Sequence, residues 1–450
     1  MTRALHALNL LRMACVAVLL VLAGLPAAAQ GLIRDAGLEH GLDRLARPIL
    51  TAAGLPANRT RVLVVNDTGM NAFVVDSRTI FVTAGLILRM QSADELQAVI
   101  AHEAAHISNG HVARRGLNAQ AARNAALVGL AVGVAAGAAS GTPEAGVGIA
   151  LGTQSSALRT FLSHTREEEA AADKSGMRYL AIAGVDPAAL GAVLENFAGQ
   201  EALTPGQQDP YARSHPLSRD RVRAVATTAD ALTPLPADRA AEHYWFGRTK
   251  ALLSAYFRSP GYTFRRVGAD DMSDSARIAR AMAHHKSGDL PAARAELAAA
   301  IDARPEDAFL HDLMGWMELE WGNWDAARDA YGRAAVLAPR EPLIKAGYGR
   351  ALLARDTGAD NARALEVLTD ARARDPYDAN LLRDLAIAHA RAGQDGLAAL
   401  ATAERYALTG RLKDAGVLAR RAEGALPTGS PGWSRAQDLI RAADMNEERR

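Results

Sequence analysis

Apolar residues in the first part of the chain recur at two different spacings. Between residues 30 and 60 they recur every three or four positions, which places them on one face of a helix. These residues are Leu38, Leu42, Leu45, Ile49 and Leu50. Three short β-branched runs follow at 61–66, 71–75 and 79–82, and turn-forming residues separate them. The pattern therefore predicts one or two helices followed by a small sheet.

Polar residues at 92–95 mark the start of the next helix. Ser92 is followed three positions later by Glu95, which is the spacing of a capping box. The helix that begins here runs through residues 102–106, which read His-Glu-Ala-Ala-His. Another helix is expected from about Phe161 to Ala183, because the glycine that follows it is suited to end a helix.

From about residue 274 the pattern repeats every 34 residues. Small, apolar and proline positions of one unit return in the next: Gly288, Ala293, Leu297, Ala300 and Pro305 are matched by Gly322, Ala327, Tyr331, Ala334 and Pro339. A longer third unit ends at Pro376, a degenerate fourth contains Gly393, and a helical cap closes the array. This period is typical of tetratricopeptide repeats, in which small residues let paired helices approach. The matches at a single shift disfavour a generic helical bundle.

The N-terminus has the features of a secretory signal. Arg3 and Arg12 precede an apolar stretch at 13–25, and an Ala-x-Ala site follows, so cleavage is expected after Ala29. A membrane anchor is the alternative, but the apolar stretch is shorter than the roughly 20 residues that a span needs. The only cysteine, Cys15, lies within the signal, so the mature chain has no disulfide.

Composition removes some classes of partner. The chain of 450 residues has a formal net charge of +1, which gives no overall field to attract nucleic acid. An apolar segment at 125–152 with almost no charge is interpreted as a helical hairpin packed on the protein. The alternative is a lid or membrane-facing loop beside the active site, which would allow a peripheral membrane contact. Each of its two arms is too short to span a bilayer.

The chemistry centres on the helical motif at 102–106. His102 and His106 are four residues apart and share one face of a helix, where two imidazoles can hold one Zn²⁺. Glu103 lies beside that face, where a carboxylate can take a proton from an activated water. A His pair without a metal is the alternative, which the capped helix, the small sheet and the signal disfavour. A structural zinc site is also disfavoured, because such sites are usually rich in cysteine.

A catalytic zinc needs a third protein ligand. On a continued helix His111 would face away from His102, so it is interpreted as a surface residue or an outer neighbour of the site. Glu169 and Asp173 are better candidates, because they are four residues apart and share a face. Glu169 can bind the metal while Asp173 orients a ligand imidazole. A solvated acidic helix start is the alternative. His215, within Ser-His-Pro, is by itself more often structural.

Together these motifs resemble the CAAX-prenyl-protease-like zinc endopeptidases, in their soluble, exported form with tetratricopeptide repeats. The resemblance extends over nearly the whole mature chain. It is carried by Asn-Ala-Phe at 71–73, Val-Thr-Ala-Gly-Leu at 82–86, the motif at 102–106, the segment 169–173 and Ser-His-Pro at 214–216.

The resemblance implies roles for particular residues. It implies one Zn²⁺ per chain, bound by His102, His106 and Glu169, with Glu103 activating water. Asp173 matches a position that orients a ligand or donates a proton. His215 matches a histidine that can lie near or on the metal and either restrain or assist activity. The strand of Ile80, Phe81 and Val82 would be the edge that pairs with an extended substrate.

These inferences predict a mainly α protein: an α+β catalytic domain with a small sheet and an HExxH helix, followed by an α-solenoid of repeats. The expected boundaries are a signal peptide at 1–29, a zinc metallopeptidase domain at 30–235, a helical linker at 236–273 and a repeat domain at 274–450.

The expected function is that of a periplasmic zinc endopeptidase. It would hydrolyse unfolded or stalled outer-membrane proteins, while its repeats bind the outer-membrane assembly machinery. The alternative is a chaperone or scaffold whose proteolysis is latent.

Overall fold

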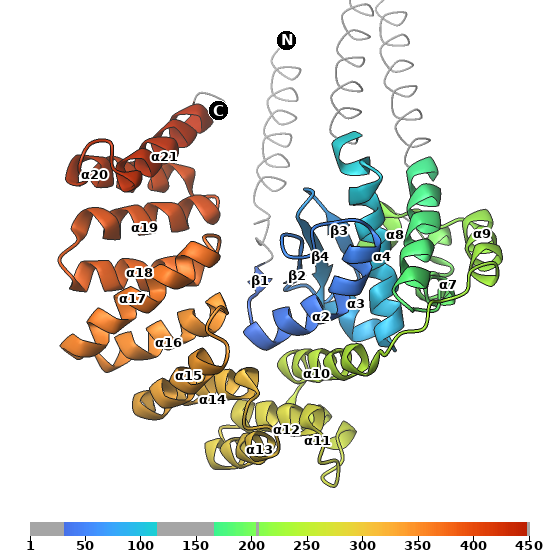
Figure 1. Cartoon of the computed structure of the whole chain (residues 1–450), viewed down its shortest axis with the longest axis horizontal. Helices are drawn as coiled ribbons and strands as arrows, with labels where there is room; N and C mark the ends of the chain where they lie inside the picture. The colour runs from blue at the N-terminus through green and yellow to red at the C-terminus, as the bar shows by residue number, and fades with distance from the viewer. Residues whose placement is uncertain (1–30, 115–165, 204–206, 448–450) are drawn as a thin grey trace, which may run out of the picture.

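A small mixed sheet forms one layer of the N-terminal domain (Figure 1). The computed structural model describes residues 31–114, 166–203 and 207–447. The strand order is β1-β2-β4-β3, with β2 and β4 parallel and the outer strands antiparallel to their neighbours. The strands are β1 (Leu32–Ile33), β2 (Arg61–Val65), β3 (Ala72–Val74) and β4 (Thr79–Thr83). The predicted strands are confirmed, and β1 is added to them.

The strand order corrects one prediction. Ile80, Phe81 and Val82 were expected to form a free edge, but β4 is bonded to β2 on one side and to β3 on the other. Among the described residues, β3 is the strand at that edge of the sheet. The order arises because β2 and β4 are the two longer strands and pair directly, which leaves the short β3 outside them.

Three helices cover the sheet and form the core of this domain: α2 (Ala36–Ala52), α3 (Ala84–Arg89) and α4 (Ala93–Ser108). The five predicted apolar residues of α2 are all buried. The Ser92 hydroxyl caps α4 by accepting the Glu95 N–H at 3.2 Å. Glu95 in turn accepts the N–H of Gln91, one residue before the position that a capping box predicts. The capped helix is buried along most of its length.

The remaining helices of the domain follow a part of the chain that is not described. A helix over residues 166–182 ends before Gly184, whose φ of +75° suits glycine. Four short elements follow: α7 (Ala188–Glu195), η1 (Gln200–Ala202), α8 (Pro210–Ser214) and α9 (Arg219–Asp230). The expected signal peptide at 1–29 and the apolar segment at 125–152 lie outside the described residues.

The segment expected as a linker contains α10 (Ala240–Phe257) and α11 (Pro260–Arg266). In Figure 1, α10 lies between the sheet-bearing domain and α12. Phe246 and Leu253 join the core of the first domain, and Ala255 joins the core of the repeats. This helix therefore connects two hydrophobic cores and is part of both.

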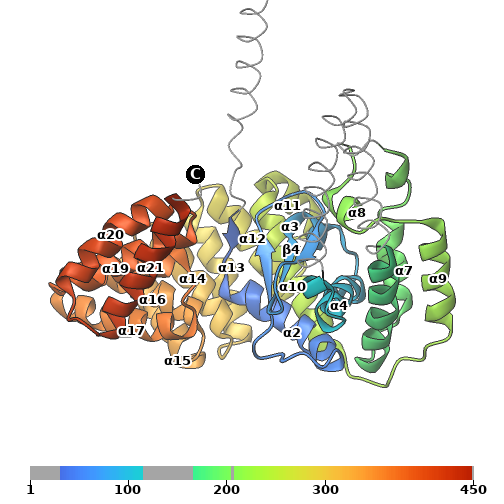
Figure 2. The same ribbon diagram turned by 90° about the horizontal axis from the view of Figure 1, so that it is seen from above.

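The repeats form a row of paired helices beside the first domain (Figure 2). They are α12 (Asp274–Lys286), α13 (Leu290–Ala303), α14 (Ala308–Glu320), α15 (Trp324–Leu337), α16 (Pro342–Arg355), α17 (Gly358–Arg374), α18 (Ala379–Arg391), α19 (Asp395–Leu408), α20 (Leu412–Ala425) and α21 (Pro431–Glu447). Tyr331 shows why small residues recur: a Cβ on Gly315 or Gly347 would lie within 2.7 Å of its ring. No described helix is long and apolar enough to cross a membrane.

A partly buried group of charges joins the two domains. Arg34 and Arg61 of the first domain contact Glu39 of that domain and Asp375, which lies between α17 and α18. Only 1% of the Asp375 side chain is exposed. We call these four residues the interdomain charge cluster.

Candidate metal centre

The helix α4 supplies three side chains to the site. His102, Glu103 and His106 are all fully buried. The Nε2 atoms of His102 and His106 lie 3.1 Å apart, as expected for two imidazoles on one helical face. The capped, buried helix therefore holds both rings toward the same point.

Two further side chains reach this point from other helices. Glu169, in the helix of residues 166–182, places one carboxylate oxygen 3.2 Å from His106 Nε2 and the other 3.2 Å from His102 Nε2. His215, directly after α8, places Nδ1 3.0 Å from Glu169 Oε2 and 3.2 Å from His102 Nε2. The ligand atoms of these four residues all lie within 4.8 Å of one another. The structure thus brings together the three predicted ligands and His215.

This donor set fits a zinc ion. Two histidines and one carboxylate are a common ligand set of catalytic zinc. Zinc–nitrogen bonds of about 2.0–2.1 Å in a tetrahedron place neighbouring ligand atoms about 3.3 Å apart. The closest separations among the ligand atoms, 3.0–3.2 Å, are near that value, and all of these atoms lie within 4.8 Å of one another. The residues could therefore hold a metal ion with little rearrangement.

Asp173 and Arg221 surround the ligands with oriented charges. Asp173 Oδ1 lies 2.9 Å from His102 Nδ1, so the ring proton is held there and Nε2 is left to bind a metal. Arg221, on α9, donates to both oxygens of Asp173 at 2.6 and 2.9 Å. Its Nη1 lies 3.2 Å from Glu169 and donates to the carbonyl of His215 at 3.2 Å. One guanidinium therefore connects the parts of the site that come from separate segments.

The protonation states of the ligands follow from these contacts. Burial lowers the pKa of His106 to about 3, so this imidazole is neutral, as metal binding requires. Burial also opposes the charge of His102, but hydrogen bonds that its ring donates to the carboxylates of Asp173 and Glu169 raise its pKa to about 9. Although burial would raise the pKa of Glu169, nearby histidines lower it well below its usual range. The pKa of Asp173 is lowered despite burial by His102 and Arg221.

Glu103 differs from the other acidic residues of the site. It is fully buried, and neither carboxylate oxygen has a hydrogen-bond partner among the described residues. The nearest charged contact is 3.3 Å, from Oε1 to His215 Nε2. The carboxylate therefore keeps free acceptor capacity directly beside the ligand atoms, which is what a general base needs.

His215 connects the site to the edge of the sheet. Its Nε2 lies 3.4 Å from the carbonyl oxygen of Ala72 in β3. The ring of Tyr211 packs against the His215 ring at 4.5 Å between centroids, and Phe197 stacks on Tyr211 at 4.7 Å. Packing and contacts on both ring nitrogens thus fix this imidazole between the ligands and the edge strand.

His111 corrects an argument from helical spacing. It is 1% exposed, and its Nδ1 lies 3.0 Å from Nδ1 of His106, so it neither faces away from the site nor lies on the surface. The helix α4 ends at Ser108, and Gly110 has a φ of +72°. Because the chain turns here, helical spacing does not extend to His111. The interpretation as an outer neighbour of the site agrees with this contact.

Sequence reasoning missed Arg221. It lies in a run that also contains Arg219 and Arg223, and no spacing distinguishes the three. Only their burial separates them, since Arg221 is 8% exposed and its two neighbours are exposed.

The fold and the site define a metal-dependent hydrolase domain joined to a helical repeat domain. Residues 34–229 match the model of Peptidase family M48. This segment, somewhat less than half of the chain, is similar to the metallopeptidases of that family and contains the four residues of the ligand group.

Named relatives extend the comparison. The chain is 24% identical to the beta-barrel assembly-enhancing protease of Escherichia coli, over 93% of this chain and 85% of that protein. It is 29% identical to a putative beta-barrel assembly-enhancing protease of Vibrio cholerae, over 46% of this chain and only 42% of that protein. It is 28% identical to a mitochondrial metalloendopeptidase of Schizosaccharomyces pombe, over 41% of this chain and 51% of that protein.

Proposed function

We propose that this chain is an exported zinc endopeptidase that cleaves misfolded or stalled envelope proteins. The observation that carries the proposal is the carboxylate of Glu103, which has no hydrogen-bond partner among the described residues and lies beside three ligand groups, His102, His106 and Glu169. The relatives named for beta-barrel assembly, together with the signal-like N-terminus, support a role in the periplasm and in outer-membrane protein quality control. The repeat domain then serves to bind protein partners.

The roles of the residues follow from their positions. His102, His106 and Glu169 would hold one Zn²⁺ per chain, which would supply Lewis-acid activation of water and of the peptide carbonyl. Glu103 takes the proton of the attacking water and returns it to the leaving amine nitrogen. Asp173 holds the His102 ring in the orientation that binds metal. Arg221 holds Asp173 in place with two hydrogen bonds.

The edge strand β3 is the proposed substrate platform. An extended peptide can add to a free strand edge, and β3 ends this side of the described sheet. The carbonyl of Ala72 faces His215 Nε2 at 3.4 Å. A peptide that pairs with β3 would therefore enter beside the ligand group and meet the His215 ring.

We infer that His215 restrains the resting site. Its Nδ1 lies among the ligand atoms, where a fourth position for water or substrate is needed. Replacement by alanine is expected to raise cleavage of an unfolded protein. A fall in cleavage would instead assign His215 an assisting role, and no change would remove it from the mechanism.

The substitution Glu103→Gln tests the enzymatic proposal. The amide keeps the shape of the side chain but cannot act as a base, so cleavage of reduced, alkylated lactalbumin should fall by about 10²–10⁴-fold. Metal content, measured by atomic emission, should remain that of the wild type. Unchanged cleavage would reject the assignment of Glu103 as the base. If Glu103→Gln loses zinc, the same two measurements are made on Glu103→Asp, which keeps a carboxylate.

The second candidate function is a chaperone or scaffold with latent proteolysis. The position of His215 within the ligand group favours it. A strain that lacks the gene separates the two functions. Restoration of outer-membrane integrity by Glu103→Gln would favour the scaffold, whereas failure to restore it would favour the protease.

A further inference from the structure

The repeat period changes near the C-terminus. The turns before α13 and α15 each contain a glycine with positive φ, Gly288 and Gly322. Turns of the same kind contain Gly393 and Gly410, but these two are only 17 residues apart, half the usual period. The helix α19 therefore follows one such turn and precedes the next.

This change exposes one face of α19. In three other repeat helices that follow a glycine turn, the positions five, nine and twelve residues after the glycine are apolar and at most 3% exposed. They are Ala293, Leu297 and Ala300 in α13, Ala327, Tyr331 and Ala334 in α15, and Ala415, Ala419 and Ala422 in α20. In α19 the same positions are Ala398, Thr402 and Arg405, and all three are partly exposed.

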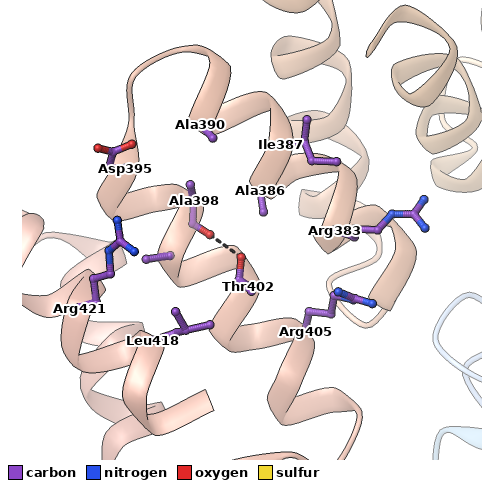
Figure 3. Close-up of a pocket in the computed structure, with 11 residues that line it drawn as sticks. Arg383, Ala386, Ile387, Ala390, Asp395, Ala398, Thr402, Arg405, Leu418 and Arg421 are labelled. Atoms are coloured by element: carbon purple, nitrogen blue, oxygen red, sulfur yellow. Dashed lines mark hydrogen bonds between the residues drawn. The ribbon is translucent and has the colours of Figure 1, made fainter. Parts of the chain in front are cut away.

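These residues line a groove between α18, α19 and α20, with a volume of about 380 Å³ (Figure 3). Thr402 stands where Tyr331 fills the corresponding space in α15, and its hydroxyl donates to the Ala398 carbonyl at 2.9 Å. Ile387, which is 40% exposed, and Leu418 add apolar surface to the groove. A short polar side chain in place of a large ring thus leaves the groove open.

The groove carries more positive than negative charge. Arg383, Arg405 and Arg421 line it together with a single acid, Asp395. Arg383 pairs with Asp384, but Arg405 and Arg421 have no ion pair within the part of the chain that the structure describes. In Figure 3, Arg383 and Arg405 lie at one end of the groove and Arg421 at the other. Unpaired guanidinium groups of this kind bind carboxylates strongly and with defined geometry.

We propose that this groove binds an extended acidic segment of a partner protein. Its carboxylates contact Arg405 and Arg421, and an apolar side chain between them packs on Leu418. Arginines at both ends of the groove match carboxylates spaced along a chain better than one terminal carboxylate. Apolar walls and the net charge of +1 disfavour nucleic acid. The proposal deepens the partner-binding part of the proposed function and does not depend on the metal centre.

Fluorescence anisotropy with a defined peptide tests the proposal. The probe is a fluorescein-labelled peptide of alternating glutamate and leucine with both ends blocked, and the protein is the full chain with Glu103→Gln. We expect binding that is at least about tenfold tighter than that of the lysine–leucine counterpart and that weakens with salt. Arg405→Ala combined with Arg421→Ala should weaken it about tenfold or more.

Matched variants keep the test specific. Arg411→Ala with Arg420→Ala removes the same charge from exposed pairs with Asp414 and Asp444, and should leave binding within about twofold. Thr402→Tyr should abolish binding by filling the groove as Tyr331 fills its own repeat, independently of charge.

Three results would overturn the proposal: equal binding of the glutamate and lysine peptides, binding unchanged by loss of Arg405 and Arg421, or binding only by a peptide with a free C-terminal carboxylate. When the groove substitutions are made in a chain that keeps Glu103, that chain should cleave unfolded lactalbumin as fast as the wild type does. A wild-type chain that cleaves nothing would therefore overturn the enzymatic proposal alone.

Discussion

The metal centre and the interdomain charge cluster are both groups of ionisable side chains, the first buried and the second partly buried, but they differ in whether their charges are paired within the protein. In the cluster, each contact joins a guanidinium donor of Arg34 or Arg61 to a carboxylate of Glu39 or Asp375. Two positive and two negative charges therefore balance within the protein. Such a group connects two domains without any added component.

In the metal centre, by contrast, ligand atoms face other ligand atoms. Nitrogen of His102 faces nitrogen of His106 and of His215 at 3.1–3.2 Å, and the Glu103 carboxylate has no hydrogen-bond partner among the described residues. A cation satisfies these contacts better than protons, because a neutral imidazole has a single N–H. In this protein, the group whose ligand atoms face one another is therefore the candidate functional site, whereas the group whose charges are paired has a structural role.

Removal of a ligand should give the largest effect. His106→Ala deletes one of three ligands, so zinc affinity should fall by more than about 100-fold, beyond the 10–100-fold typical of outer partners. Thermal stabilisation by added zinc should disappear with it, since binding to the native state stabilises that state. Calorimetric titration and melting curves measure both effects. As a control, Asp375→Asn in the charge cluster should bind zinc as the wild type does. Full zinc affinity in His106→Ala would contradict the conclusion that the ligand atoms of the metal centre are arranged to bind a cation.

Loss of one member of the charge cluster should destabilise the protein without affecting zinc. Asp375→Ala leaves two arginines with the single carboxylate of Glu39, and breaking a buried pair costs about 3–5 kcal/mol. Urea unfolding measures the change. The matched control is Asp438→Ala, whose pair with Arg441 is exposed, and which should cost less than about 1 kcal/mol. Equal stability of the two variants would mean that the cluster is not structural.

Features that depend on local spacing could be predicted from the sequence. The motif at 102–106, the pair Glu169 and Asp173, and the 34-residue period all rest on which residues share a helical face. The confirmed helices and strands follow from the same patterns. The contact between Glu169 and His106 could be predicted only with the family resemblance, because residue spacing within one helix does not show which other helix it contacts.

Features that depend on tertiary packing could not be predicted. The position of β4 inside the sheet depends on how β2 and β3 are arranged in space. The contact of His111 depends on a turn at Gly110 that interrupts the helix. Arg221 looks like its neighbours in sequence, and only the fold places its guanidinium against Asp173. Each miss therefore depends on a turn or a tertiary contact that no sequence period encodes.

Replacement of Arg221 tests whether a residue that contacts the ligands, but does not bind the metal itself, affects zinc affinity. Arg221→Lys keeps the charge but cannot make both hydrogen bonds to Asp173. Because outer partners tune the ligands, zinc affinity should fall by about 10–100-fold. Arg219→Lys, on the same helix but exposed, should bind zinc as the wild type does. Unchanged affinity in Arg221→Lys would show that His102 is oriented without this arginine.

Glu341 tests how complete the charge balance between the domains is. It caps α16 by accepting the Leu343 N–H at 3.3 Å. Burial raises the pKa of its carboxyl from 4.5 to about 7, and the charges that act on it are Glu39, Arg61 and Asp375. This acid therefore stands beside the cluster as a negative charge that the two arginines do not fully compensate.

The sign of its pH dependence follows from the raised pKa. Between about pH 4.5 and 7 the unfolded chain loses this proton before the folded chain does, so the wild type loses stability as the pH rises through that window. Glu341→Gln should therefore be more stable than the wild type at about pH 8, by about 1 kcal/mol after allowance for solvent screening. The difference should vanish near about pH 4.5. Glu306→Gln, in an exposed pair with Arg333, should show no such trend in melting curves. Parallel curves for Glu341→Gln and the wild type would mean that Arg61 compensates this acid as well, and that the charge balance of the junction extends beyond the four residues of the cluster.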